Sequence, residues 1–452
     1  MRPPFDDKRH RGKQCSHVKG GTILNQSIAR NTTLPRTNWA GNLTYSSDRL
    51  IVPNTVAEAQ EAVKTAKKMR VVGSRHCFND IADTTGTHIS LERLDRVLSL
   101  DTSGHRVTVE GGIRYGELGP YLHERGYALH NMASLPHISV AGACATATHG
   151  SGAVGNLAVA VAELEFINAE GDLVVLKRDH DESFAGAVVN LGALGVVTKL
   201  TLDVQPAFDV RQDVFCDLPI AALETHFDEI VSSGYSVSTF TVWQTDDIEQ
   251  VWIKSALRPG VPFSPRETLF GARPATCNLH PMTGLDAIHC TEQMGVAGAS
   301  HDRLPHFRSG FTPASGEELQ VEYFVPREHA AAAIRAIRQQ GHWMKDLVVG
   351  AEIRTIAADA LWLSPCYQTP CVAFHFSFKR NWPALRTILP KIEEALAPLQ
   401  PRPHWGKMFT MPPAEIQARY PRLSDFKALI HAHDPQGKFR NRFVDRTLFS
   451  GA

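Results

Sequence analysis

The stretch 70–80, RVVGSRHCFND, limits the possible folds of this chain more than any other. Its two adjacent valines predict a short buried strand, which ends at Gly73 and Ser74. Glycine permits the tight main-chain conformations of a loop that wraps a phosphate, the serine hydroxyl can donate a hydrogen bond, and Arg75 adds positive charge. A ligand with a pyrophosphate would suit this loop, although these residues on their own fit an ordinary polar turn better.

Secondary-structure signals on both sides of this stretch indicate an α+β domain. A helix is expected to begin at Val56 with Asn54 or Thr55 as its N-cap, and apolar periodicity indicates a second helix at 115–125. Strands are predicted at 49–53, 70–74, 88–94, 97–101, 106–110, 159–168, 173–177 and 196–204. No G-x-G-x-x-G sequence follows any of these strands, so binding of NAD through a Rossmann fold is unsupported.

The residues GSRHCFND at 73–80, followed by IAD, resemble the flavin-attachment loop of the vanillyl-alcohol oxidase family. Within this family the alditol and xylitol oxidases are most similar, and the likeness runs from about Thr37 to Phe449. The resemblance implies a two-subdomain FAD-binding domain of the PCMH type and a substrate-binding cap domain with an antiparallel sheet. It also implies a covalent bond between His76 and the 8α-methyl group of FAD. The other residues of this loop that it places beside the cofactor are Gly73, Ser74, Arg75, Cys77 and Asn79.

Residues 131–152 form a second informative stretch, which is built almost entirely from small residues and hydroxyls. Small side chains let main-chain amides approach a ligand closely, and hydroxyls can bond to phosphate oxygens. A glycine-rich surface loop is the alternative, which the length and low charge of the stretch disfavour. The stretch resembles the second pyrophosphate and isoalloxazine loop of the same family, with Ser134 at the substrate end of the flavin. The residues that this resemblance places along FAD are Ser139, Gly142, Thr146, His149, Gly150 and Gly152, with Gly195 and Val196 near the adenine half.

Four segments are expected along the chain. Residues 1–36 are polar and without periodicity, and they lack the apolar region of a secretory signal, so they are predicted to be either a disordered extension or the result of a misplaced start. The FAD-binding domain is expected at 37–206 and the cap domain at 207–400, in which 255–316 form long loops. The resemblance implies that 401–452 returns to the FAD-binding domain. The cap elements predicted from periodicity are strands at 319–325, 348–356 and 371–378 and helices at 327–340 and 382–396.

Two polar pairs lie on neighbouring predicted strands of the cap domain. Glu352 and Arg354 are two residues apart, as are His375 and Ser377, so each pair shares one face of its strand. A solvent-facing salt bridge is the simplest interpretation of such pairs. The alternate residues of both strands are apolar and suited to a core, which favours polar faces that line a cavity. Alditol oxidases have threonine at the position of Ser377, so the preferred polyol stays open.

The resemblance assigns roles to these residues. Glu352, Arg354, His375 and Lys407 match residues that contact the polyol in alditol oxidases, and Gln320 matches another cavity residue. Arg354 and Lys407 would stabilise a developing alkoxide, Glu352 would hold Arg354, and His375 could assist proton removal.

The activity implied by the resemblance is FAD-dependent oxidation of the primary C1 hydroxyl of an alditol, such as xylitol or sorbitol, to the aldose. Hydride would pass to flavin N5, and O₂ would be reduced to hydrogen peroxide. Two alternatives stay open. One is an aldonolactone oxidase or dehydrogenase of the same family, and the other is a sugar-binding flavoprotein without turnover.

The composition disfavours several other partners. The chain has 47 basic and 47 acidic residues, so nothing indicates a nucleic acid or an anionic membrane. None of its 21 histidines has a metal-site spacing, and no metal is expected. No stretch approaches the ~20 apolar residues of a membrane-spanning helix. The 8 cysteines form no C-x-x-C pair, which favours reduced thiols in the cytoplasm. The resemblance implies a small polyol and O₂ as partners, and a monomer is expected.

Overall fold

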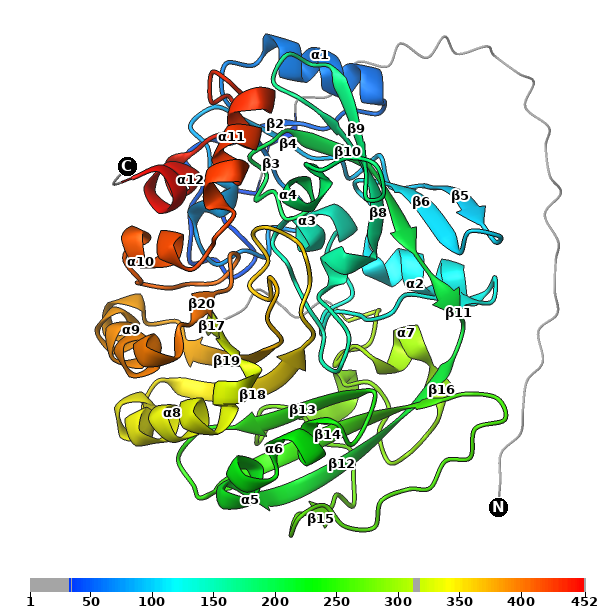
Figure 1. Cartoon of the computed structure of the whole chain (residues 1–452), viewed down its shortest axis with the longest axis vertical. Coiled ribbons are helices and arrows are strands. Elements are labelled where there is room, and N and C mark those ends of the chain that lie inside the picture. Colours follow the sequence, from blue (N-terminus) through cyan, green and yellow to red (C-terminus); the bar gives the residue numbers. More distant parts are fainter. Residues whose placement is uncertain (1–31, 34, 312–317, 451–452) are drawn as a thin grey trace, which may run out of the picture.

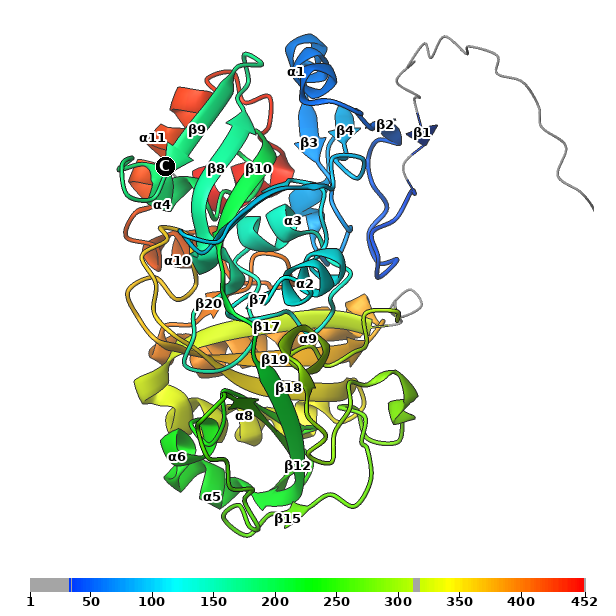
Figure 2. The same ribbon diagram turned by 90° about the vertical axis from the view of Figure 1, so that its right-hand side faces the viewer.

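The computed structural model describes residues 32–33, 35–311 and 318–450. Most of the predicted extension 1–36 therefore lies outside the described residues. Two small sheets lie at one end of the molecule and a large sheet lies at the other (Figure 1). Figure 2 shows from the side that helix α3 (Val140–Ala145) and the loops around it lie between the two ends.

The first small sheet has four strands in the order β1 (Thr32–Thr33), β2 (Arg49–Ile51), β4 (Thr87–Ile89), β3 (Met69–Val71). β4 pairs in parallel with both β2 and β3. Helix α1 (Val56–Thr65) begins after Thr55, whose side chain accepts a hydrogen bond from Glu58 N, so of the two predicted N-caps the structure selects Thr55. The predicted strand 88–94 is wrong beyond Ile89, because the chain turns there and Leu94 N donates to Leu91 O.

The second small sheet has five antiparallel strands. Their order is β5 (Val97–Asp101), β6 (Arg106–Glu110), β10 (Val196–Asp203), β8 (Val161–Ile167), β9 (Leu173–Lys177). Helix α2 (Tyr115–His123) follows β6, and α4 (Phe184–Ala187) follows β9. The stretch 131–152, which resembles a cofactor loop of the family, contains helix α3, because Val140, Ala143 and Cys144 bury one side of a short helical segment.

The large sheet is antiparallel throughout. Its order is β15 (Arg273–Pro274), β12 (Asp209–Pro219), β14 (Asp247–Leu257), β13 (Ser236–Thr241), β18 (Val348–Ile356), β19 (Cys371–Lys379), β17 (Glu318–Pro326), β20 (Arg402–Pro403), with β16 (Gly298–Ala299) beside β12. Helices α8 (Ala330–Met344) and α9 (Trp382–Leu396) pack side by side against it (Figure 1). These elements confirm the βαββα unit predicted for the cap domain, and the bounds of β18 and α9 are those predicted.

Most of the remaining elements are short. They are β7 (Tyr127–Ala128), β11 (Gln205–Pro206), α5 (Ile220–Thr225), α6 (Phe227–Val231), α7 (Ser300–Arg303), α10 (Pro413–Ala418), α11 (Leu423–His433) and α12 (Arg442–Val444), with single turns at 80–82, 157–160, 287–289, 327–329, 397–399 and 445–449. Among the described helices, none has both the length and the apolar character needed to cross a membrane.

The last part of the chain touches both ends of the molecule. β20 pairs with β17 in the large sheet, although it follows the proposed boundary at residue 400. Further on, Lys438 O accepts a hydrogen bond from Met69 N, and Phe439 O accepts one from the Arg70 guanidinium, so the chain lies against β3. The domain limits 37–206, 207–400 and 401–452 stay a proposal. On the two sides of the proposed limit at residue 206, β10 belongs to a small sheet and β12 belongs to the large sheet.

Candidate active site

A cavity of about 990 Å³ lies between the small sheets and the large sheet. This volume is at the upper end of ligand pockets, which have roughly 300–1,000 Å³. One wall consists of loops from the first half of the chain, and the other is the face of β17, β18 and β19. All predicted site residues line this cavity except four: Asn79, Gly150, Gly152 and Val196.

The four exceptions have contacts that shape the walls from outside. Asn79 Nδ2 donates to the main-chain oxygens of Trp405 and Lys407 at 2.8 and 2.7 Å, so it fixes the loop that carries Lys407. A Cβ at Gly150 would lie 2.2 Å from an oxygen of Asn131, and Gly152 N donates to Thr355 O at 2.9 Å. Val196 is buried in the core between the small sheets. These residues support the cavity without facing it.

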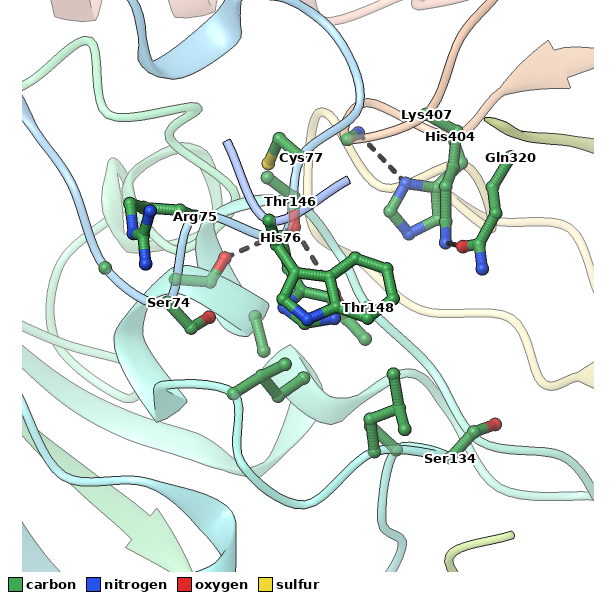
Figure 3. Close-up of a pocket in the computed structure, with 18 of the residues that line it drawn as sticks. Ser74, Arg75, His76, Cys77, Ser134, Thr146, Thr148, Gln320, His404 and Lys407 are labelled. Atoms are coloured by element: carbon green, nitrogen blue, oxygen red, sulfur yellow. Dashed lines mark hydrogen bonds between the residues drawn. The ribbon is translucent and has the colours of Figure 1, made fainter. Parts of the chain in front are cut away.

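His76 lies on a loop that is held from both sides. Arg75 adopts a φ of 60° and its oxygen accepts a hydrogen bond from Trp39 N at 2.8 Å. Phe78 N donates to Gly406 O at 2.8 Å, from the far end of the chain. The His76 ring stacks on Trp39 with 4.3 Å between ring centroids. Figure 3 shows His76 and its loop on one side of the pocket, with Lys407 and Gln320 on another.

The imidazole of His76 has two free nitrogens. Both ring nitrogens are buried, and neither has a hydrogen-bond partner among the described residues. Burial, together with nearby His137 and Lys407, lowers the pKa of His76 well below its usual value. The ring is therefore neutral, with a nitrogen lone pair available. An unpartnered buried nitrogen costs free energy unless something else completes the site, and a flavin bound through this ring would fit that need.

Small residues leave room on the loop wall. A Cβ added at Gly73 would lie 2.5 Å from Ser139 Oγ, and one at Gly142 would lie 2.7 Å from the same atom. The hydroxyls of Thr146 and Thr148 lie 3.3 Å apart on the same wall. The close approach of these residues forms a cradle that larger side chains would fill, so the wall fits a phosphate-bearing cofactor such as FAD.

The opposite wall is a cluster of buried charges on adjacent strands. Glu352 pairs with His375 across β18 and β19, and His375 pairs with Glu322 across β19 and β17. Arg354 donates to Glu322 Oε1 at 3.0 Å, and its Nε lies 3.5 Å from Glu352 Oε1. Glu352 and Arg354 are only 6% and 7% exposed, which excludes the solvent-facing salt bridge and confirms the predicted shared face. Arg354 also reaches across the cavity to Ser134 Oγ at 3.4 Å.

Glu322 is the main residue that the sequence reasoning missed. Its carboxylate lies 3.1 Å from His149 Nε2, 3.0 Å from Arg354 Nη2 and 3.7 Å from His375 Nδ1. It therefore joins the loop wall to the sheet wall at one point. The signal was present, because Glu322 is two residues from Gln320 and so shares its face of the strand.

The charges of this cluster stabilise one another. Burial alone would raise the pKa of Glu322, but His149, His375 and Arg354 hold it well below its usual value. In the same way Arg354 and His306 hold the pKa of Glu352 below its usual value against the effect of burial. Burial lowers the pKa of Arg354, and the two carboxylates outweigh that effect and raise it. Both carboxylates and the guanidinium are therefore ionised at neutral pH.

Lys407 and His375 complete this wall. The Lys407 ammonium donates to Gln320 Oε1 and lies 4.9 Å from the centre of the Phe78 ring. Burial lowers the pKa of Lys407 and of His375. His375 is therefore neutral at pH 7, with Nε2 at 3.4 Å from Ser377 Oγ, and it is able to accept a proton. His306 and His404 also line the cavity and were not predicted.

Comparisons with known proteins agree with this architecture. Residues 47–177 match the FAD binding domain family, and residues 316–447 match the D-arabinono-1,4-lactone oxidase family. Alditol oxidase of Streptomyces sp. is 45% identical over 419 residues, which cover 92% of this chain and 99% of that protein. L-gulono-1,4-lactone dehydrogenase of Mycobacterium tuberculosis is 29% identical over 434 residues, covering 91% and 98%.

A solved structure supports the fold. The crystal structure of cholesterol oxidase from B. sterolicum superposes on this structure with a TM-score of 0.75 at 14% sequence identity. The superposition covers 94% of this chain and 99% of the cholesterol oxidase chain. Together with the FAD-binding match, this confirms the predicted α+β fold with a two-subdomain FAD-binding domain and an antiparallel cap sheet.

Proposed function

Since the chain belongs to the vanillyl-alcohol oxidase family of FAD-dependent oxidoreductases, we propose that it oxidises the primary C1 hydroxyl of alditols such as xylitol and sorbitol to the aldose. FAD would take up the hydride from C1 and deliver the electrons to O₂, giving hydrogen peroxide. The observation that carries this proposal is the sheet wall opposite His76. The hydrogen-bonding residues of that wall that face the cavity are Gln320, Glu352, Arg354, His375, Ser377 and Lys407, and Ser134 faces them from the loop wall.

The loop wall would hold FAD. We propose that a ring nitrogen of His76 bonds covalently to the 8α-methyl group, because both nitrogens are buried without a partner and the ring is neutral. The phosphates would lie against Gly73, Ser139 and Gly142. The two glycines leave room there because they have no side chain, and Ser139 supplies a hydroxyl donor. Acid precipitation of the purified protein should leave yellow colour in the pellet. Complete release of flavin into the supernatant would contradict the covalent bond.

The sheet wall would act on the substrate hydroxyl. Arg354 and Lys407 place two cations in the cavity, and each would stabilise the developing alkoxide by an amount that is typically about 2.7–4 kcal/mol for one such donor. Glu352 would hold the guanidinium in place at 3.5 Å. His375 would accept the hydroxyl proton, and Glu322 at 3.7 Å would stabilise the resulting imidazolium.

An aldonolactone oxidase or dehydrogenase is the second candidate. It is favoured by the match of residues 316–447, which include β17, β18, β19 and Lys407, to the D-arabinono-1,4-lactone oxidase family. A lactone ring presents fewer free hydroxyls than an open-chain polyol of the same length, so it would leave more of the polar wall unpaired. A sugar-binding flavoprotein without turnover has no need for two buried cations at the reacting end, and Arg354 and Lys407 argue against it.

A substrate panel tests the proposal directly. Peroxide production should be measured with xylitol, sorbitol, a γ-lactone and benzyl alcohol. A site built for hydroxyls can reject an analogue without them by up to ~10⁴–10⁵ in kcat/KM, so the polyols should far exceed benzyl alcohol. A γ-lactone that is preferred over both polyols would favour the second candidate. Equal values for benzyl alcohol and xylitol would show that the polar wall does not select the substrate.

A further inference from the structure

A buried lysine lies beside the sheet wall, on the same face of the large sheet as Arg354, and has no role in the proposed function. Lys254 is on β14 and is only 1% exposed. Its Nζ donates to three acceptors, which are Leu304 O, Pro305 O at 3.1 Å and His306 Nδ1 at 3.1 Å. An ammonium carries three N–H donors and no lone pair. The three contacts therefore match the charged form of this lysine. Burial lowers the pKa of Lys254 to about 7, so the ammonium predominates below that pH.

These contacts determine the tautomer of His306. Because the ammonium donates to Nδ1, that nitrogen carries no hydrogen, and the proton of the neutral ring is on Nε2. Nε2 lies 2.8 Å from Glu352 Oε1, so His306 donates to the carboxylate there. The opposite tautomer would place two acceptors against each other at this distance, and the Lys254 ammonium would lose an acceptor.

The surroundings keep His306 neutral. Burial first, and then the positive charge of Lys254, lower the pKa of His306 to about 4, while Glu352 acts in the other direction and Arg354 adds to the lowering. The other rings packed against it, Phe240 on β13 and Trp252 on β14, carry no charge. Lys254 has Cys290 as a further titratable neighbour, and burial raises the pKa of that thiol to about 11, so it stays neutral.

The segment that carries His306 also fixes the loop wall. His306 N and Phe307 N both donate to Ser134 O, at 3.1 and 3.3 Å. Pro305 O, which accepts from Lys254, also accepts from Thr291 Oγ1 at 2.8 Å. Lys254 thus holds the segment 304–307, and this segment contacts two residues of the cavity, Glu352 and Ser134.

We infer that Lys254 and His306 are positioning residues: the lysine fixes His306 as its Nε2–H tautomer, and His306 holds Glu352 as a carboxylate against Arg354. The effect on catalysis rests on the proposed function, whereas the tautomer is a property of the protein whatever its substrate. Arg354 then presents its remaining N–H groups to the cavity with its carboxylate partners fixed.

The first test uses the wild-type holoprotein and needs no turnover. With ¹⁵N-labelled histidine, and with the His306→Gln variant to assign the signal, NMR should show His306 as the Nε2–H tautomer without titration between about pH 5.5 and 7, the range in which the Lys254 ammonium is present. A signal from the Nδ1–H tautomer, or titration near the ordinary pKa of about 6.5, would overturn the inference. Failure of the protein to oxidise xylitol would remove the proposed function and leave this result intact.

The second test removes the lysine. Lys254→Met should raise the pKa of His306, because the nearby positive charge is gone, and should lower kcat/KM for xylitol about tenfold, most strongly at acidic pH. Lys438→Met is the matched control, since Lys438 Nζ also donates to two main-chain oxygens, those of Val63 and Ala169, far from the sheet wall. The control should keep the wild-type pH profile. An unchanged pH profile in Lys254→Met would overturn the inference.

Variants of His306 keep the inference testable if Lys254→Met does not fold. His306→Gln retains an N–H group that can donate to Glu352, whereas His306→Leu retains none. The glutamine variant should stay within about threefold of wild type in kcat/KM, and the leucine variant should lose about tenfold or more. Equal losses in the two variants would show that bulk, and not the donated hydrogen bond, is what matters at this position.

Discussion

The two walls of the cavity differ in how they are suited to a ligand, one by its shape and the other by its charges. On the loop wall, Gly73 and Gly142 leave space around Ser139, and His76 presents a neutral ring. On the sheet wall, buried carboxylates and cations satisfy one another around Arg354. The shape of the loop wall depends on glycines, which have no side chain to fill the space. The structure of the sheet wall depends on the attraction between its charged side chains. We therefore expect size changes to disturb cofactor binding on one wall and charge changes to disturb the rate on the other.

The largest expected effect is on the sheet wall. Lys407→Ala should lower kcat by about 100-fold or more, because it removes an electrostatic donor that acts on the transition state. Flavin content should stay at the wild-type level. Steady-state kinetics and flavin absorbance would check this, with Lys407→Arg as a variant that keeps the charge. A rise in KM alone would assign Lys407 to substrate binding, and a loss of flavin would break the distinction between the walls.

The next effect is on the loop wall. Gly195 has a φ of +153°, and a Cβ there would lie 2.1 Å from Ile167 O. Gly195→Ala should therefore destabilise the protein by about 1–3 kcal/mol and lower the fraction that carries flavin. Absorbance and thermal unfolding measure both quantities. Gly310→Ala is the control, because nothing lies within 4 Å of the added Cβ. A Gly195→Ala protein with full flavin and a lower kcat would contradict the comparison.

Glu322 sharpens the comparison, because it touches both walls. Glu322→Gln should lower kcat about tenfold, since the amide stabilises neither Arg354 nor a protonated His375 as a carboxylate does. The carboxylate raises the pKa of His375, and its loss lets burial lower that pKa further. The pH at which kcat/KM falls on acidification should therefore move to lower values.

The control for Glu322 is Glu110→Gln. Glu110 is also a buried carboxylate paired with an arginine, Arg96 at 2.8 Å, but it lies on β6 and outside the cavity. Its pH–rate profile should match that of wild type. If the profile of Glu322→Gln also stays in place, His375 is not the group that accepts the proton.

The smallest effect concerns substrate choice. Ser377 lies beside His375 and opposite Gly350 in β18, and it is buried. Ser377→Thr adds one methyl group, which should change the ratio of kcat/KM for xylitol and sorbitol by up to about tenfold. The reaction and the flavin content should not change. An unaltered ratio would show that the substrate chain does not reach this part of the sheet wall.

Much of this architecture could be predicted from the sequence, since local patterns determine it. The strand 348–356 and the helix 382–396 have the predicted bounds, and the spacing of Glu352 and Arg354 gave their shared face correctly. The prediction of a strand at 88–94 is wrong beyond Ile89, because apolar residues can pack against the core from a turn as well as from a strand.

The contacts that could not be predicted depend on pairing between distant segments. Glu322 and His375 meet because β17 and β19 pair in one particular register, and register is not encoded in either strand alone. Lys254 reaches His306 through a fold that brings together residues separated by 52 positions, and Glu352 follows 46 positions later. A single sequence presents Lys254, His306 and Glu352 as isolated polar residues in three separate segments.

The dependence of the His76 loop on residues 405–407 has a consequence for biosynthesis. Phe78 N donates to Gly406 O, and Asn79 donates to Trp405 O, which follows it by 326 positions. During translation the loop leaves the ribosome long before these partners exist. The site that would capture the flavin is therefore completed only after residue 407 has been added. Attachment at His76 would then be a late event in the life of each molecule, dependent on the supply of free cofactor at that moment.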